Sequence, residues 1–269
     1  MSKVMNEQQQ RPGQAAAGQT AGPADRPEGT RSTPAQLGRL FGVGVGPGDP
    51  ELITVKAYRI LKQAPVIAYP KKRSGSKSYA LEIVELYVDA GKKTMLGLVF
   101  PMTRDPAELA SKWQQTADRV WAELVVGRDV AFVTEGDPML YSTFIHLARL
   151  LQEQHPDVEI QSIPGISSVN AAASRFGQAL ADGDESVAIV PARDDPQAMR
   201  QVLLSHDCVV FIKVAKVLDT MLDVLAELHL TQCATVATKL TSGDERIWRN
   251  VEELRGRELN YLTLMVVRK

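Results

Sequence analysis

The sequence predicts an α/β fold made of two α/β domains with an active-site cleft between them. Strand patterns alternate with helix patterns from residue 37 onward, which is typical of a largely parallel sheet covered by helices. The strand patterns at residues 39–45 and 128–134 each run into a turn that contains Gly, Asp and Pro. Ligands of open α/β sheets bind in the crevice outside the carboxyl ends of the strands. These two turns are therefore the expected location of the functional site.

The first domain is expected to span residues 37–163. Its strands are predicted from short apolar runs rich in β-branched and aromatic side chains, and its helices from apolar residues that recur on one face. The predicted strands are residues 39–45, 66–69, 94–100, 128–134 and 158–163. The predicted helices are residues 51–63, 79–89, 106–126 and a segment that begins at residue 142.

The second domain is expected to span residues 164–269 and to begin with a helix at residues 167–176. Its predicted strands are residues 186–191, 208–214, 233–238 and 261–268. Helices are predicted between them at residues 196–205 and 217–229. The last two extended segments, around residues 247–249 and 262–267, are expected to pair with each other as antiparallel strands.

Composition indicates a globular protein with a substantial core, because 44% of the residues are hydrophobic and 23% are charged. The net charge of −1 provides no basic field for nucleic acid, so no nucleic-acid partner is expected. No apolar run is long enough to span a membrane, and no membrane partner is expected. Residues 1–36 almost lack large apolar side chains and are predicted to be a disordered tail without a signal peptide.

The two cysteines, Cys208 and Cys233, lie in apolar strand patterns. They are interpreted as small buried hydrophobic residues rather than a disulfide or metal ligands, which favours a reducing compartment such as the cytoplasm. No spacing of metal ligands is present, and none of the four histidines forms a nucleophilic constellation with Ser or Cys. No metal site is predicted.

Two nucleotide-binding motifs are excluded. A dinucleotide fingerprint G-x-G-x-x-G would need a third Gly where Pro47, Asp49 or Glu51 stands, and the second strand ends in Lys71-Lys72 instead of a ribose-binding acid. No Walker A pattern occurs either. A nicotinamide dehydrogenase and a P-loop nucleotidase are therefore disfavoured.

Four segments in the same order resemble one known family. They are GVGVGPGDPELITVKAYRIL, AYPKK, TEGDPMLYST and IPGISSVNAAA. Together they resemble the tetrapyrrole methylases, in the version found in the C-20 methyltransferases of precorrin-2 or cobalt-precorrin-2. The resemblance begins near residue 37 and covers the rest of the chain. It implies transfer of a methyl group from S-adenosyl-L-methionine to C-20 of such a macrocycle in cobalamin biosynthesis, and it implies a homodimer.

The resemblance also implies roles for individual residues. The candidates for taking a proton or polarising the substrate are Glu135, Asp137 and Tyr141. The implied cofactor contacts are Pro47, Gly136, Asp137, Met139, Leu140, Ser167, Ser168, Lys213, Val214, Ala237 and Leu240. The implied substrate contacts are Gly46, Pro47, Gly48, Asp49, Lys71, Lys72, Arg73 and Lys77. The four cations of that last set would attract the carboxylates of a tetrapyrrole.

Each of these features also has a purely structural alternative. Asp137 could cap the helix that follows it, Ser167 could be an N-cap without a ligand, and Lys213 could be a solvated side chain at a strand end. The run of cations could be a solvated loop. For the whole protein, the alternatives are a methylase acting on uroporphyrinogen III or another corrin carbon, and a non-catalytic module that binds a tetrapyrrole or a nucleotide.

Overall fold

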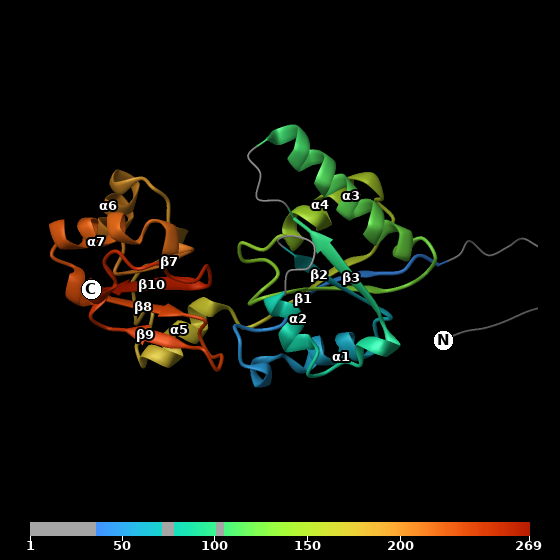
Figure 1. Cartoon of the computed structure of the whole chain (residues 1–269), viewed down its shortest axis with the longest axis horizontal. Coiled ribbons are helices and arrows are strands. Elements are labelled where there is room, and N and C mark those ends of the chain that lie inside the picture. Colours follow the sequence, from blue (N-terminus) through green and yellow to red (C-terminus); the bar gives the residue numbers. More distant parts are fainter. Residues whose placement is uncertain (1–35, 72–77, 101–104) are drawn as a thin grey trace, which may run out of the picture. The chain divides into compact units, whose positions relative to one another are not determined.

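The structure is a computed structural model that describes residues 36–71, 78–100 and 105–269. Residues 35–269 form one compact unit. Two five-stranded sheets organise this unit, and helices cover both faces of each sheet (Figure 1). The predicted α/β class is confirmed. The predicted tail lies outside the described residues except for Gln36, and the domain boundary after residue 163 stays a prediction.

The first sheet is entirely parallel, with strand order β3-β2-β4-β1-β5. Its strands are β1 (Leu40–Gly44), β2 (Val66–Lys71), β3 (Thr94–Val99), β4 (Val130–Thr134) and β5 (Ile160–Ile163). One face is covered by α1 (Val55–Gln63) and α2 (Tyr79–Val84), and the other by α3 (Pro106–Leu124) and α4 (Phe144–Gln154) (Figure 1). The strands are buried on both faces, which explains why their sequences are continuous apolar runs.

Four predicted helix boundaries in this half differ from the structure, and one of them is the end of α3 at Leu124, two residues earlier than predicted. The helix predicted from residue 51 is a short 3-10 turn at Pro50–Leu52, and α1 begins only at Val55 because the Thr54 side chain accepts a hydrogen bond from Ala57 N. Helix α2 ends at Val84, earlier than predicted. Helix α4 begins at Phe144, where the Ser142 hydroxyl accepts a hydrogen bond from the backbone N–H.

The second sheet is mixed, with strand order β6-β7-β10-β8-β9. Its strands are β6 (Val187–Pro191), β7 (Cys208–Ile212), β8 (Ala234–Thr238), β9 (Arg246–Trp248) and β10 (Thr263–Arg268). The expectation that the last two extended segments pair with each other is wrong. Strands β9 and β10 each pair antiparallel with β8, on its opposite sides.

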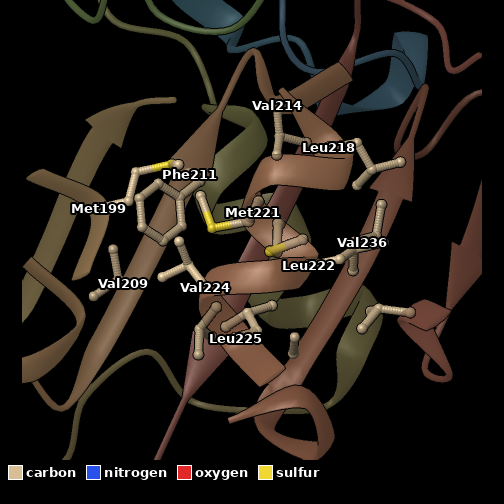
Figure 2. Packing of buried hydrophobic residues seen from close by; sticks show 14 of the residues in the cluster. Met199, Val209, Phe211, Val214, Leu218, Met221, Leu222, Val224, Leu225 and Val236 are labelled. Atoms are coloured by element: carbon tan, nitrogen blue, oxygen red, sulfur yellow. The ribbon is translucent and has the colours of Figure 1, made fainter. Parts of the chain in front are cut away.

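Helix α5 (Ser168–Phe176) covers one face of the second sheet, and α6 (Pro196–Ser205) and α7 (Leu218–Glu227) cover the other. Figure 2 shows the packing beneath α7, where Met221 and Leu222 point toward side chains of the sheet that include Phe211 and Val236. Cys208 is buried in the core between α5 and the sheet, as predicted, whereas Cys233 is only half-buried and ends a 3-10 helix before β8; both cysteines are free. Short 3-10 helices complete the chain at Ala90–Lys92, Val214–Lys216, Thr231–Cys233 and Val251–Leu254. Among the described helices, none is long and apolar enough to cross a membrane.

Three backbone turns meet where β1, β4 and β5 end. A Cβ built on Gly44 would lie 2.5 Å from the carbonyl oxygen of Gly136, and one built on Gly165 would lie 2.1 Å from the same oxygen. Gly136 itself has φ +65°, and its N–H donates to the Gly46 carbonyl at 2.8 Å. Glycine at these positions is therefore required by close backbone approach and by a left-handed φ.

The Asp137 carboxylate joins the turn after β4 to the turn after β5 by hydrogen bonds. Its Oδ1 accepts a hydrogen bond from Met139 N at 2.8 Å, and its Oδ2 accepts one from Gly165 N at 3.0 Å. The alternative in which Asp137 caps α4 is wrong, because α4 begins seven residues later, at Phe144. The carboxylate instead holds the turn after β4 against the turn after β5.

The glycine contacts predict a large difference between two Gly→Ala substitutions. Gly165→Ala forces a Cβ against backbone atoms that cannot rotate away, so we expect the free energy of unfolding to fall by about 1–3 kcal/mol. Gly243→Ala is the matched control, because no heavy atom lies within 4 Å of its Cβ, and its effect is expected to stay below about 0.5 kcal/mol. Urea unfolding followed by circular dichroism measures both. Equal stabilities would contradict the packing described for the three turns.

The Asp137 contacts predict a second difference, between two Asp→Asn substitutions in Gly-Asp-Pro turns. Asn at position 137 keeps one acceptor and turns an amide N–H₂ toward the other backbone donor, so we expect a loss of about 1–3 kcal/mol. Within the described part of the chain, Asp49 accepts one backbone N–H, from Glu51, and the Asn oxygen can replace that acceptor. Asp49→Asn is expected to unfold near the wild-type urea midpoint. A neutral Asp137→Asn would show that the carboxylate does not join the turns.

Candidate active site

A cavity of about 610 Å³ lies at the carboxyl ends of the first sheet and is bordered on its other side by loops of the second sheet. Strand ends and turns of the first sheet contribute Pro47, Pro70, Lys71, Thr134, Glu135, Leu140, Tyr141, Ser142 and Thr143. Helix α2 contributes Tyr79 and Glu82, and the residue before it contributes Ser78. Ser168, Ile212, Lys213, Lys239, Leu240 and residues 260–264 line the remainder, together with Phe100. The cavity thus has apolar walls with a few charged and phenolic groups, which is typical of a small-molecule site.

The turn after β1 is docked onto the loop that follows β8. A Cβ on Gly48 would lie 2.6 Å from the Leu240 carbonyl oxygen, and Asp49 N donates to Thr241 Oγ1 at 2.9 Å. These contacts place Pro47 and Leu240 in the same wall. Asp49 itself lies on the other side of the turn, where it lines a separate cavity of about 550 Å³ with Thr241.

Backbone strain is concentrated around the cavity. Tyr141, Lys213 and Lys239 all line it and have φ values of 53°, 59° and 48°. Non-glycine residues pay about 1–3 kcal/mol for such conformations, which persist where the surrounding structure fixes them and cluster at functional sites. Lys213 and Lys239 follow β7 and β8 directly, so the strain turns the chain at two strand ends of the second sheet.

Tyr141 connects the two sheets across the cavity mouth. Its hydroxyl donates a hydrogen bond to the Ile189 carbonyl of β6 at 3.1 Å. The Lys213 ammonium lies 5.9 Å from the centroid of the same ring, which is within the range of a cation–π contact. Tyr141 therefore holds a fixed position although its side chain is partly exposed.

Two further phenols are kept protonated at neutral pH. Burial raises the pKa of Tyr79, and the carboxylates of Glu135 and Glu82 add to this effect. Burial also raises the pKa of Tyr261, again with a contribution from the negative charge of Glu135. A protonated phenol keeps an O–H group that can donate a hydrogen bond.

Among the described residues, three lysines give the cavity wall positive charge, and they come from different strand ends. Lys71 ends β2, with its ammonium 5.1 Å from the Tyr69 ring centroid, and Lys213 follows β7. Lys239 pairs with Asp244 at 2.6 Å, and this hydrogen bond raises the pKa of the lysine. One neutral group adds to the polar lining, because the buried Oγ of Ser78 has no hydrogen-bond partner in the described structure.

The structure gathers part of the predicted site in the cavity wall. The predicted residues that line it are Pro47, Lys71, Glu135, Leu140, Tyr141, Ser168, Lys213 and Leu240. The predicted residues that stand behind or beside this wall are Gly46, Gly48, Asp49, Gly136, Asp137, Met139, Ser167, Val214 and Ala237. Lys72, Arg73 and Lys77 lie outside the described residues.

Several lining residues escaped sequence reasoning, notably Tyr79, Glu82, Lys239 and Tyr261. Lys239 could have been found, because it directly follows a predicted strand. Tyr261 could not, because its segment was expected to pair with residues 247–249, whereas β10 pairs with β7 and β8. Among the described residues, no group of three or more His, Cys, Asp or Glu side chains could hold a metal ion.

Residues 39–254 match the family described as Tetrapyrrole (Corrin/Porphyrin) Methylases. The chain is 35% identical to the cobalt-precorrin-2 C(20)-methyltransferase of Salmonella typhimurium, over 86% of this chain and 97% of that protein. It is 33% identical to a probable cobalt-precorrin-2 C(20)-methyltransferase of Methanocaldococcus jannaschii, over 86% and 96%. It is 34% identical to the precorrin-2 C(20)-methyltransferase of a Sinorhizobium species, over 71% and 79%.

Solved structures show the same fold. A cobalt precorrin-4 methyltransferase, described as a cobalamin biosynthetic enzyme, matches with a TM-score of 0.65 and 21% identity, over 89% of this chain and 98% of the other. A uroporphyrin-III C-methyltransferase from Thermus thermophilus, complexed with S-adenosylhomocysteine, matches with a TM-score of 0.60 and 20% identity, over 86% and 98%. The family match along most of the chain and the relatives at 33–35% identity lead to one conclusion, that this chain belongs to the tetrapyrrole methylases.

Proposed function

We propose that this protein is a methyltransferase that moves a methyl group from S-adenosyl-L-methionine to C-20 of precorrin-2 or cobalt-precorrin-2 in cobalamin biosynthesis. The observation that carries this proposal is the similarity to proteins named as C(20)-methyltransferases along 97% and 96% of their own length. The walled cavity at the strand ends supports it, because methyl transfer between two bound molecules depends on holding them in line and excluding water.

The residues around the turns fit a nucleoside cofactor. Leu140 and Leu240 provide apolar surface for a base, and Ser168 brings the first turn of α5 into the wall. The free N–H groups of a helix N-terminus favour a carboxylate such as that of the methionine part. S-adenosyl-L-methionine supplies an electrophilic methyl group on a sulfonium sulfur when it is bound. We propose that it is held by Pro47, Gly136, Asp137, Met139, Leu140, Ser167, Ser168, Lys213, Val214, Ala237 and Leu240.

We propose that the tetrapyrrole occupies the part of the cavity between Lys71 and Lys239. The lysines can attract carboxylates, and Tyr79 and Tyr261 can donate hydrogen bonds as neutral phenols. The turn that contains Gly46, Pro47, Gly48 and Asp49 would form the floor, with Lys72, Arg73 and Lys77 as further proposed contacts. Glu135, Asp137 and Tyr141 are the proposed candidates for proton transfer or polarisation.

We also propose that the protein acts in the cytoplasm as a homodimer, without a nucleic-acid or membrane partner. The free cysteines support a reducing compartment. The homodimer is proposed from the family resemblance.

The proposed reaction is tested by incubating the purified protein with S-adenosyl-L-methionine and either precorrin-2 or cobalt-precorrin-2. We expect a mass gain of one methyl group and formation of S-adenosylhomocysteine, and nuclear magnetic resonance should place the methyl group on C-20. The comparison of the two substrates decides whether the natural substrate contains cobalt. Methylation of uroporphyrinogen III or of another carbon would assign the protein to a different methylase. Binding of S-adenosylhomocysteine without any methyl transfer would indicate a binding module.

The proposed role of the cations beside β2 predicts a salt-dependent effect on substrate kinetics. If Lys71, Lys72, Arg73 and Lys77 attract the carboxylates, changing all four to Ser should raise KM for the macrocycle severalfold and flatten its dependence on salt. The affinity for S-adenosylhomocysteine and kcat should change little, because uniform binding affects KM more than the chemical step.

The matched control changes four exposed cations outside the cavity wall, Lys56, Lys62, Lys92 and Arg149, to Ser. It removes the same net charge, so it should leave KM and its salt response close to wild type. If the two variants behave alike, the cations beside β2 form a solvated loop.

A further inference from the structure

The loop that follows β8 carries two residues of the cavity wall, Lys239 and Leu240, which are consecutive in the chain. Under the proposed function, Lys239 attracts carboxylates of the macrocycle and Leu240 contacts the methyl donor. The backbone is strained on both sides of Leu240, because Lys239 and Thr241 have φ values of 48° and 65°. Such conformations persist only where surrounding contacts fix them. The position of this loop therefore depends on what holds Thr241.

Glu245 supplies a contact of this kind from outside the wall. Its Oε2 accepts a hydrogen bond from Thr241 N at 2.6 Å, so a carboxylate closes the strained turn. The Glu245 side chain is 11% exposed, and it lines the second cavity rather than the first. Glu245 therefore reaches the wall of the first cavity through the backbone and does not contact a ligand bound there.

Arg175 of α5 holds this carboxylate in place. Its Nε donates to Oε1 and Oε2 of Glu245 at 2.9 and 3.0 Å, and its Nη2 donates to Oε1 at 2.5 Å. A forked pairing of this type fixes the orientation of a carboxylate as well as its position. The same pairing lowers the pKa of the Glu245 carboxyl, which keeps the group ionised at neutral pH. Helix α5 is thus connected through one ion pair to the backbone of the loop.

A loop without this connection would adopt several conformations, and only one of them presents the two wall residues correctly. The apparent Kd of a ligand rises by the inverse of the fraction of protein in the competent conformation. Once both ligands are bound, their own contacts hold the loop in that conformation. Loss of the connection is therefore expected to weaken binding much more than it slows the chemical step.

We propose that Glu245 is a positioning residue that holds Lys239 and Leu240 in the cavity wall. It does so through the backbone of Thr241, and Arg175 orients its carboxylate for this contact. The inference rests on the proposed function for the identity of the two ligands. The effect on the loop itself is measurable in the protein without any ligand.

Amide exchange of Thr241 tests the effect on the loop. In Glu245→Gln the side chain keeps one acceptor oxygen and turns an amide N–H₂ group toward either Thr241 N or Arg175. We expect the Thr241 N–H to exchange with deuterium about tenfold faster than in wild type. Nuclear magnetic resonance resolves this single position, and circular dichroism verifies that the variant is folded.

Ligand binding and kinetics separate positioning from a catalytic role. In Glu245→Gln we expect the Kd for S-adenosylhomocysteine and the KM for both substrates to rise about tenfold, whereas kcat stays within about twofold of wild type. The first ligand to bind would order the loop for the second. S-adenosylhomocysteine should therefore increase the affinity for the macrocycle more in the variant than in wild type.

Glu185→Gln is the matched control for a general loss of stability. Glu185 also accepts a backbone N–H, from Asp182 at 2.7 Å, and pairs with Arg268 at 2.5 Å, but none of these residues lines either cavity. This variant should keep Kd and KM near wild type. Arg175→Lys retains a positive charge beside Glu245 and should bind S-adenosylhomocysteine more tightly than Arg175→Gln.

Three results would overturn the positioning role. They are wild-type exchange of Thr241 and wild-type affinity for S-adenosylhomocysteine in folded Glu245→Gln, a fall in kcat alone, or equal effects of the Glu245 and Glu185 substitutions. The proposed function can fail separately. Faster exchange and weaker S-adenosylhomocysteine binding in Glu245→Gln, with no methyl transfer to any macrocycle by wild type, would overturn the proposed function and support the positioning role.

Discussion

The close approach of three backbone turns at the ends of β1, β4 and β5 is the constraint on which the rest of the site depends. Gly44, Gly136 and Gly165 bring peptide groups together at distances that exclude a Cβ, and the Asp137 carboxylate accepts donors from two of the turns. These contacts fix the direction in which the chain leaves each strand. Consequently they determine where Pro47, Glu135 and Ser168 enter the cavity wall. The glycines and Asp137 thus determine the shape of the site, although Gly44, Gly136, Gly165 and Asp137 do not themselves line the cavity.

The second sheet contributes the other half of the wall through loops that carry backbone strain. Lys213 and Lys239 adopt left-handed conformations directly after β7 and β8, and the Leu240 carbonyl packs against Gly48 of the first sheet. Packing against a glycine that has no side chain leaves little freedom for either loop. A charged group held in this way loses little conformational entropy when a ligand binds, which favours affinity. The backbone strain at Lys213 and Lys239 is thus the energetic cost of holding their two ammonium groups at defined positions in the cavity wall.

Much of the fold could be predicted because each strand of the parallel sheet is a continuous apolar run, and because turns with Gly, Asp and Pro interrupt the runs. The rule that sites form at carboxyl ends of strands pointed to the two turns with Gly, Asp and Pro, and the family resemblance pointed to Pro47, Glu135 and Lys213, which line the cavity. The pairing of β9 and β10 could not be predicted, since local pattern does not specify a distant partner. The role of Asp137 was also hidden, because its second hydrogen-bond donor, Gly165, lies 28 residues away. Tyr79 and Tyr261 line the same cavity, but they come from segments that lie far apart in the sequence and belong to different sheets, so local pattern could not bring them together.

The order of strands in the second sheet has a consequence for how the protein reaches its native state. Strand β10 lies between β7 and β8, yet it is the last of the three in sequence. Until residues 263–268 are available, β7 and β8 each present an unpaired edge with an apolar sequence. Such edges are templates for pairing with other chains, and folding steps that wait for distant strands are slow. Aggregation during synthesis or refolding is therefore expected to arise from this half of the protein, whereas the parallel sheet, whose strands all precede residue 164, can assemble first.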